Sequence, residues 1–187
     1  MKSKSILSIV LIFMLSIGMV GCKNKELSNN VRPSDVQKAA LTMAYTKGNV
    51  GDTIKVTISC AVPTGAELSG VQFDLTFNKD VLSPVIYYEK DSEDKENSED
   101  KEIDSTRYFT EQLAKFGINL VNMNDGSVRF MAADVSFANP IVNTSDIVVV
   151  EFKVLGELSD DSLNFENVEM TDMEANIIEF DLKKEVQ

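Results

Sequence analysis

Residues 68–85 constrain the fold of this 187-residue chain more than any other segment, because apolar and polar side chains alternate along them. The alternating residues are, in chain order, Val71, Gln72, Phe73, Asp74, Leu75, Thr76, Phe77 and Asn78. A period of two puts the apolar side chains on one face of a β-strand and the polar side chains on the other. Such a half-buried strand is typical of an antiparallel sheet with one covered face, since parallel sheets give continuous apolar runs.

Turn signals separate further strand-like segments, so the chain is predicted to be a succession of short strands. Besides 69–78, we expect strands at 41–45, 53–60, 81–88, 118–122, 127–134, 147–155, 163–170 and 176–182. The first should lie at a sheet edge, and 81–88 should pair with 69–78. Residues 106–116 have apolar side chains at helical spacing and predict a short helix.

These elements predict an all-β, nine-stranded antiparallel sandwich with at most one short helix. Strand spacing alone leaves open whether the sandwich is immunoglobulin-like or a jelly-roll. The length of the chain suits a single domain once a leader has been removed.

The first 21 residues have the features of a secretory leader. Lys2 and Lys4 give a basic start, and the apolar run at 6–17 is shorter than the roughly 20 residues that a membrane-spanning helix needs. The sequence Met19-Val20-Gly21-Cys22 resembles the bacterial lipobox, whose cysteine is acylated and becomes the first mature residue.

We therefore expect residues 1–21 to be a lipoprotein signal peptide and 22–39 to be a flexible tether that starts at acylated Cys22. The domain itself would occupy 40–187. A lipid anchor would hold it on the extracellular face of the bacterial cell membrane.

Residues 89–104 form an acidic segment of Asp, Glu, Ser, Lys and Asn in which Ile103 is the only apolar residue. We interpret this segment as a solvated insertion loop. A calcium loop of the EF-hand type is the alternative, but Lys95 stands at a ligand position and Glu96 stands where that loop requires glycine.

Composition excludes several classes of function. The formal net charge of −12 would repel phosphate backbones, so we expect no nucleic-acid partner. The chain has no histidine and therefore lacks the commonest general base and transition-metal ligand. Carboxylates at Asp74, Asp134, Asp172 and Glu174 could act in pairs, but nothing in the sequence brings two together, and Cys60 has the pattern of a buried small hydrophobe. We expect no enzymatic activity and no metal or cofactor on this chain.

The alternating strand, its Asn-Lys-Asp turn and the following Val81-Leu82 pair resemble the cohesin domains of cellulosome-type assemblies. The segments Val128-Arg129-Phe130-Met131-Ala132-Ala133-Asp134 and 148–154 extend the resemblance, which covers roughly 40–182. It implies a flattened jelly-roll and a membrane-anchored interaction module that binds a dockerin-bearing secreted protein, often a glycoside hydrolase. Calcium would then belong to the dockerin, and contact with polysaccharide would be indirect.

The same resemblance implies a set of partner-binding residues on one sheet face and the loop beyond it. They are Gly70, Gln72, Asn122, Met131, Ala133, Asp134, Ser136 and Asn167. The period of two supports part of this set independently, because Met131 and Ala133 face outward if Phe130 and Ala132 face inward.

Two alternatives remain open at this point. One is a carbohydrate-binding sandwich on a surface lipoprotein, although the chain has no tryptophan and only four tyrosines for stacking on sugars. The other is a cohesin-like fold used for a different adhesion or envelope contact.

The lipobox resemblance predicts that Cys22→Ala abolishes incorporation of labelled fatty acid and moves the protein out of the membrane fraction. Two or more acyl chains give stable attachment, whereas a single chain holds only marginally. Metabolic labelling and cell fractionation measure both effects. Unchanged labelling of the variant would refute the anchor.

Overall fold

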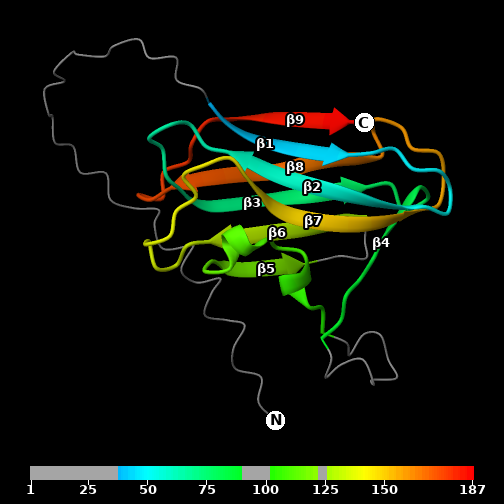
Figure 1. Cartoon of the computed structure of the whole chain (residues 1–187), viewed down its shortest axis with the longest axis horizontal. Coiled ribbons are helices and arrows are strands. Elements are labelled where there is room, and N and C mark those ends of the chain that lie inside the picture. Colours follow the sequence, from blue (N-terminus) through cyan, green and yellow to red (C-terminus); the bar gives the residue numbers. More distant parts are fainter. Residues whose placement is uncertain (1–37, 90–101, 122–125) are drawn as a thin grey trace, which may run out of the picture. The chain divides into compact units, whose positions relative to one another are not determined.

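The structure, a computed structural model, describes residues 38–89, 102–121 and 126–187. These residues form nine strands in two sheets packed face to face (Figure 1). One sheet has the order β4-β7-β2-β1-β9 and the other has the order β5-β6-β3-β8. The strands are β1 (Ala39–Tyr45), β2 (Thr53–Ala61), β3 (Leu68–Phe77), β4 (Leu82–Pro84), β5 (Gly117–Val121), β6 (Ser127–Ala133), β7 (Ser145–Val154), β8 (Leu163–Asp172) and β9 (Phe180–Val186).

The apolar side of β3 is buried as the alternation predicts, and aromatic rings fill the space around it. Phe73 stacks on Phe130 of β6 at a centroid distance of 5.2 Å and meets Phe165 of β8 edge-on at 5.5 Å. Phe77 packs against Phe152 of β7 in the facing sheet, at 5.2 Å. Ring contacts thus join strands within one sheet and connect the two sheets across the core.

The prediction that residues 41–45 form an edge strand is wrong. β1 is hydrogen-bonded to β2 in antiparallel register and to β9 in parallel register, and Leu41 and Met43 are fully buried. The edge belongs to β9, whose charged residues include Lys183 and Lys184. Charged side chains disfavour pairing with a further strand, so β9 suits the edge better than β1 does.

Residues 81–88 do not pair with β3, contrary to the prediction. Asn78 O accepts hydrogen bonds from the amides of Val81 and Leu82, and this turn carries the chain across to the other sheet. There β4 pairs with β7 over only three residues. Pro84 costs no hydrogen bond to β7, because the amides on either side of it alternate in direction and the next residue, Val85, donates to Glu151 O.

The helix predicted within 106–116 is replaced by two 3₁₀ turns, Ser105–Arg107 and Glu111–Leu113, on either side of an extended segment. The amide of Thr110 donates to Ile147 O, and the amide of Val149 donates to Tyr108 O. Phe109 also packs edge-on against Phe130 at 5.8 Å. Pairing with the edge of β7 therefore overrides the helical spacing of the sequence.

The strand predicted at 176–182 is divided between the two sheets. Thr171 of β8 forms an isolated bridge with Ile177, and the amide of Ile178 donates to Met170 O. The chain then crosses over and enters β9 at Phe180. Two short pairings thus replace one strand.

The two ends of the acidic segment 89–104 are joined to each other. Tyr88 bridges to Ile103, the amide of Glu89 donates to Glu102 O, and the amide of Asp104 donates to Tyr87 O. Ile103 is partly buried against the core. The base of the insertion is therefore part of the folded domain, and residues 90–101 lie outside the described residues.

Replacing residues 90–101 with a short Gly-Ser linker should change the free energy of unfolding by less than about 1 kcal/mol, because closure entropy depends only logarithmically on loop length. Replacing all of 89–104 should cost about 1 to 2 kcal/mol more, since it removes two backbone hydrogen bonds and the packing of Ile103. Urea denaturation of both variants measures the difference. A large loss in the shorter replacement would contradict a solvated insertion.

Candidate functional site

The solvent-facing side of the β5-β6-β3-β8 sheet, called here the outer face, holds most of the predicted partner-binding residues. Its inward side supplies core residues from every strand, including Ile118, Phe130, Phe73 and Phe165. Antiparallel register places the remaining side chains in rows that cross the sheet. Three of these rows define the character of the surface.

The first row consists mainly of small residues and has an exposed apolar side chain at each end. In order across the sheet it contains Gly117, Ala133, Gly70, Thr171 and Ile177. A Cβ on Gly70 would lie 2.5 Å from Oγ1 of Thr171, so no larger residue fits there without movement. Exposed Val135 lies beside Gly117, and Ile177 is exposed at the opposite end. The row is therefore low in relief and apolar at both ends.

The second row mixes polar and apolar side chains. It contains Asn119, Met131, Gln72 and Glu169, in that order across the sheet. Met131 and Gln72 are partly exposed at the centre of the face. A flexible thioether next to small residues can adapt its shape to a partner.

The third row is built around an ion pair. Arg129 donates from Nε and Nη2 to the two carboxylate oxygens of Asp74, at 2.6 and 2.7 Å. Asn167 donates from Nδ2 to Asp74 Oδ2 at 2.7 Å. We call Asp74, Arg129 and Asn167 the polar network. Its carboxylate is only 10% exposed, whereas the arginine side chain is 45% exposed.

A bulge in β8 places Asn167 in this network. The register between β3 and β8 shifts between Gln72 and Asp74, and Asn167 has a φ of 48°. Asparagine tolerates this left-handed region better than most residues do. The bulge turns its amide toward the carboxylate.

The charge state of Asp74 follows from these contacts. The hydrogen bonds from Arg129 lower the pKa of Asp74 below its ordinary value. Burial opposes this shift, and the hydrogen bond from Asn167 lowers the pKa further. Asp74 therefore stays ionised under neutral and mildly acidic conditions.

Comparison with known proteins identifies the family of this chain. A family model described as the cohesin domain matches residues 39–184. The chain belongs to the cohesin family. The nine-stranded jelly-roll sandwich predicted from the sequence is thereby confirmed.

This cohesin is similar to several solved structures, at identities that show the fold alone. It is 10% identical to a non-cellulosomal cohesin from Archaeoglobus fulgidus, over 81% of this chain and 92% of that one, with a TM-score of 0.56. It is 21% identical to type II cohesin A11 from Bacteroides cellulosolvens, over 76% and 94%, with a TM-score of 0.53. The sixth cohesin from scaffoldin B of Acetivibrio cellulolyticus, in complex with a Cel5 dockerin, matches at 13% over 81% and 100%, with a TM-score of 0.56. Among curated proteins no match was found.

Most of the residues predicted from the resemblance lie together on the outer face of this cohesin. Gly70, Gln72, Met131 and Ala133 occupy neighbouring positions of β3 and β6, and Asn167 lies on β8. The remaining predicted residues on described positions, Asp134 and Ser136, follow the end of β6. Asn122 lies outside the described residues.

Asp134 shapes the loop after β6 and offers no free carboxylate. It is 2% exposed, and its side chain accepts hydrogen bonds from Ser136 Oγ at 2.6 Å and from the amides of Ser136 and Asn139. The hydrogen bond from the Ser136 hydroxyl is the main cause that lowers the pKa of Asp134. Ser136 itself is exposed, so it remains available for contact.

The carboxylates considered for catalysis are used in local structure. Asp172 accepts hydrogen bonds from the amides of Glu174 and Asn176 and from the Asn176 side chain, in the turn after β8. Burial raises the pKa of the Cys60 thiol to about 12, which leaves the thiol protonated. Within the part of the chain that the structure describes, no group of three or more His, Cys, Asp or Glu side chains could hold a metal ion.

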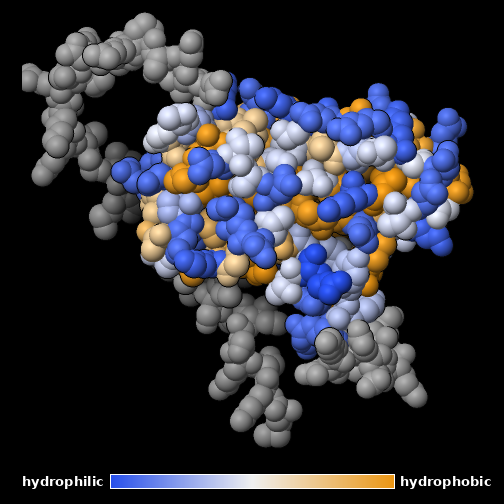
Figure 2. Space-filling view, viewed as in Figure 1, coloured by the Kyte–Doolittle hydropathy of each residue, from blue (hydrophilic) through white to orange (hydrophobic). Residues whose placement is uncertain are grey.

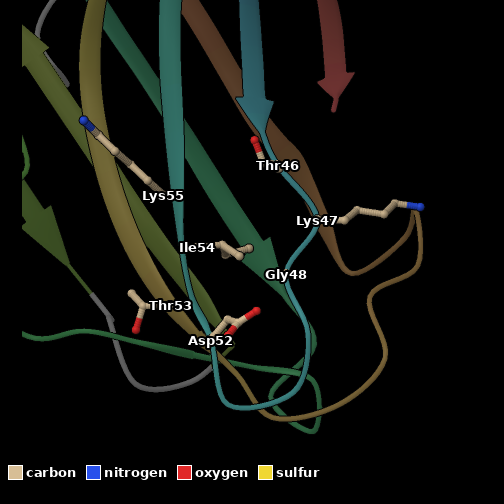
Figure 3. Close-up of a pocket in the computed structure, with 7 residues that line it drawn as sticks. All are labelled: Thr46, Lys47, Gly48, Asp52, Thr53, Ile54 and Lys55. Carbon is tan, nitrogen blue, oxygen red and sulfur yellow. The ribbon is translucent and has the colours of Figure 1, made fainter.

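A hollow of about 370 Å³ lies away from the outer face, at the turn between β1 and β2. Figure 3 shows its two lysines, Lys47 and Lys55, pointing in opposite directions. Lys47 also lies 3.4 Å from Asp160. The hollow has no aromatic side chain and no converging charges, so it lacks the features of a sugar or anion site.

Sequence reasoning missed Arg129, Val135 and Ile177 as parts of the outer face. Arg129 has the same parity along its strand as Met131, so its outward direction could have been predicted. Its pairing with Asp74 could not, because the register between β3 and β6 is a tertiary feature.

Arg129→Gln should lower the free energy of unfolding by about 1 to 2 kcal/mol at pH 7, since it removes the positive charge and the two hydrogen bonds that Arg129 supplies to the largely buried Asp74. The lowered pKa of Asp74 stabilises the wild type above the unfolded-state value of about 3.9. That contribution is lost as the pH falls below it, so the difference between the proteins should shrink below about pH 4. Urea denaturation at several pH values measures this. A difference that is independent of pH would contradict the assigned role of Asp74.

Proposed function

We propose that this cohesin is a receptor that captures a dockerin-bearing secreted protein on its outer face, as part of polysaccharide degradation. The observation that carries the proposal is the family match over 39–184, together with the low-relief row formed by Gly117, Ala133, Gly70 and Thr171. Cohesin domains are non-catalytic interaction modules, so the proposed activity is binding alone.

Solved relatives support the choice of partner. The sixth cohesin of Acetivibrio cellulolyticus scaffoldin B was solved in complex with a Cel5 dockerin. By analogy, the partner of the present chain would carry a dockerin joined to a glycoside hydrolase. Calcium would be bound by the dockerin.

The form of the outer face suits a packed helix better than a small ligand. Gly117 and Ala133 let a partner backbone approach closely, whereas Gly70 is buried beside the Thr171 side chain. Val135 and Ile177 place exposed apolar side chains at the two ends of the row. Exposed apolar groups with a polar surround are typical of protein contacts. Figure 2 shows mainly the other sheet, where hydrophilic residues spread over the visible surface with smaller hydrophobic areas between them.

We propose also that Cys22 carries a lipid anchor that holds the domain at the extracellular face of the cell membrane. The support is the basic start, the apolar run at 6–17 and the lipobox-like Met19-Val20-Gly21-Cys22. Among the described residues, no helix is long and apolar enough to cross a membrane.

A carbohydrate-binding function has less support. Among the described aromatic residues, Phe137 alone is exposed, at 59%. One exposed ring is a poor platform for stacking on a sugar chain. The second candidate function is a different adhesion or envelope contact. It is supported by the archaeal relative, which is described as a non-cellulosomal cohesin.

Ala133→Arg should weaken dockerin binding by about thirty-fold to several thousand-fold, because it places a bulky charge inside the interface, at a cost of about 2 to 5 kcal/mol. Chelation of calcium should abolish binding as well, since a calcium-loop partner needs the metal to fold. Isothermal titration calorimetry with dockerins from the secreted proteome measures both effects.

Ala44→Arg is the matched control. Ala44 is also a partly buried alanine that faces solvent, but it lies on β1 in the other sheet. This variant should bind like the wild type. Calcium-independent capture of a polysaccharide that Ala133→Arg leaves unchanged would overturn the receptor function, and so would equal losses in both variants.

A further inference from the structure

The polar network leaves one side of the Arg129 guanidinium unused. An arginine carries five N–H donors, which form two forks that each match a carboxylate. Asp74 occupies the fork made by Nε and Nη2. The fork made by Nη1 and the second hydrogen of Nη2 has no acceptor among the described residues.

This free fork is both accessible and held in place. The Arg129 side chain is 45% exposed, whereas the Asp74 side chain to which it is bound is 10% exposed. Asp74 is held in turn by Asn167. The guanidinium is therefore fixed before a partner arrives, so less conformational entropy is lost on binding than for a free arginine.

The charged residues around the polar network indicate which groups of a partner would bind there. Arg129 is the only basic residue on β5, β6, β3 and β8, whereas β8 carries Glu166 and Glu169 on exposed positions. A negative group would thus be attracted at a single point of the face. Basic groups would be favoured on the side of β8.

We propose that Arg129 determines partner specificity by binding an Asp or Glu side chain of the docked partner through Nη1 and Nη2, while Asp74 holds Nε and Nη2. This inference rests on the proposed function, because it assigns the chemistry of the partner at the same face. The carboxylate is favoured over a single backbone carbonyl because it can accept two parallel N–H donors. Asp74 acts as the positioning residue.

The test uses synthetic partners, so that it does not depend on whether any dockerin binds. The mature chain, residues 22–187 with Cys22→Ser, is used to select helices from a surface-randomised three-helix scaffold, with Ala133→Arg as the counter-selection target. Selected helices should carry an Asp or Glu at one common position. Helices without a common acidic residue would overturn the proposal, and so would a failure to select any.

Variants of Arg129 then identify the contact. Arg129→Gln should weaken the binding of a selected helix at least tenfold. Replacing the acidic residue of the helix with Gln should weaken binding by the same factor, and the two changes together should weaken it no further. Arg129→Lys, which keeps the charge and loses the fork, should recover only part of the loss. Arg107→Gln is the matched control, because Arg107 lies over the Tyr87 ring, whose hydroxyl bonds Glu151 of β7 in the other sheet. Equal losses for Arg107→Gln and Arg129→Gln would overturn the proposal.

A spectroscopic measurement separates direct contact from a loss of fold. The chain has three arginines, Arg32, Arg107 and Arg129, so ¹⁵N-arginine labelling gives few side-chain signals. Addition of a selected helix to the wild type should shift the Arg129 Nη signal, which Arg129→Lys assigns. An Arg129 signal that stays unchanged at saturation would overturn the proposal even if the variants bind weakly.

Discussion

The structure depends on β3 being hydrogen-bonded along both of its edges. β6 pairs with it on one side and β8 on the other, so its alternation is imposed on the whole sheet. Phe73 faces the core and Asp74 faces outward, one residue apart. A slip of one residue in register would reverse this and place the carboxylate among aromatic rings, which would be strongly unfavourable.

The ends of the outer face are held through one buried serine. Ser69 O accepts a hydrogen bond from the amide of Asp134, and Ser69 Oγ donates to the carbonyl of Asp172. These two aspartates then organise the loops that follow β6 and β8, which carry Val135 and Ile177. The exposed apolar side chains are thus presented by loops with fixed backbones, which suits a preformed contact surface.

The sequence was sufficient for what depends on local pattern. Alternation predicted which side of β3 meets the core and that Met131 and Ala133 face the same side, and turn signals located most strands. The polar side of β3 is less exposed than predicted, because Gly70 and Asp74 are buried as well. The sequence pattern failed to predict the structure where pairing between distant segments determines it. Phe109 pairs with β7 in place of continuing a helix, and β1 lies inside its sheet because the distant β9 covers it. The polar network was missed because it needs the register of three strands and a bulge that no local signal marks.

The balance of charge on the outer face explains how an acidic protein can hold a specific contact there. The chain has a net charge of −12, yet Asp74 and Arg129 neutralise each other at the centre of this face. The bonds to Asp74 offset the charge of Arg129 and fix its guanidinium, while the second fork, made by Nη1 and Nη2, stays open to an acidic group of a partner. The surrounding acidic residues remain in water, where they contribute mainly to long-range steering. Shape and small residues can therefore set the affinity of the surface, while a single oriented guanidinium can set the identity of what binds.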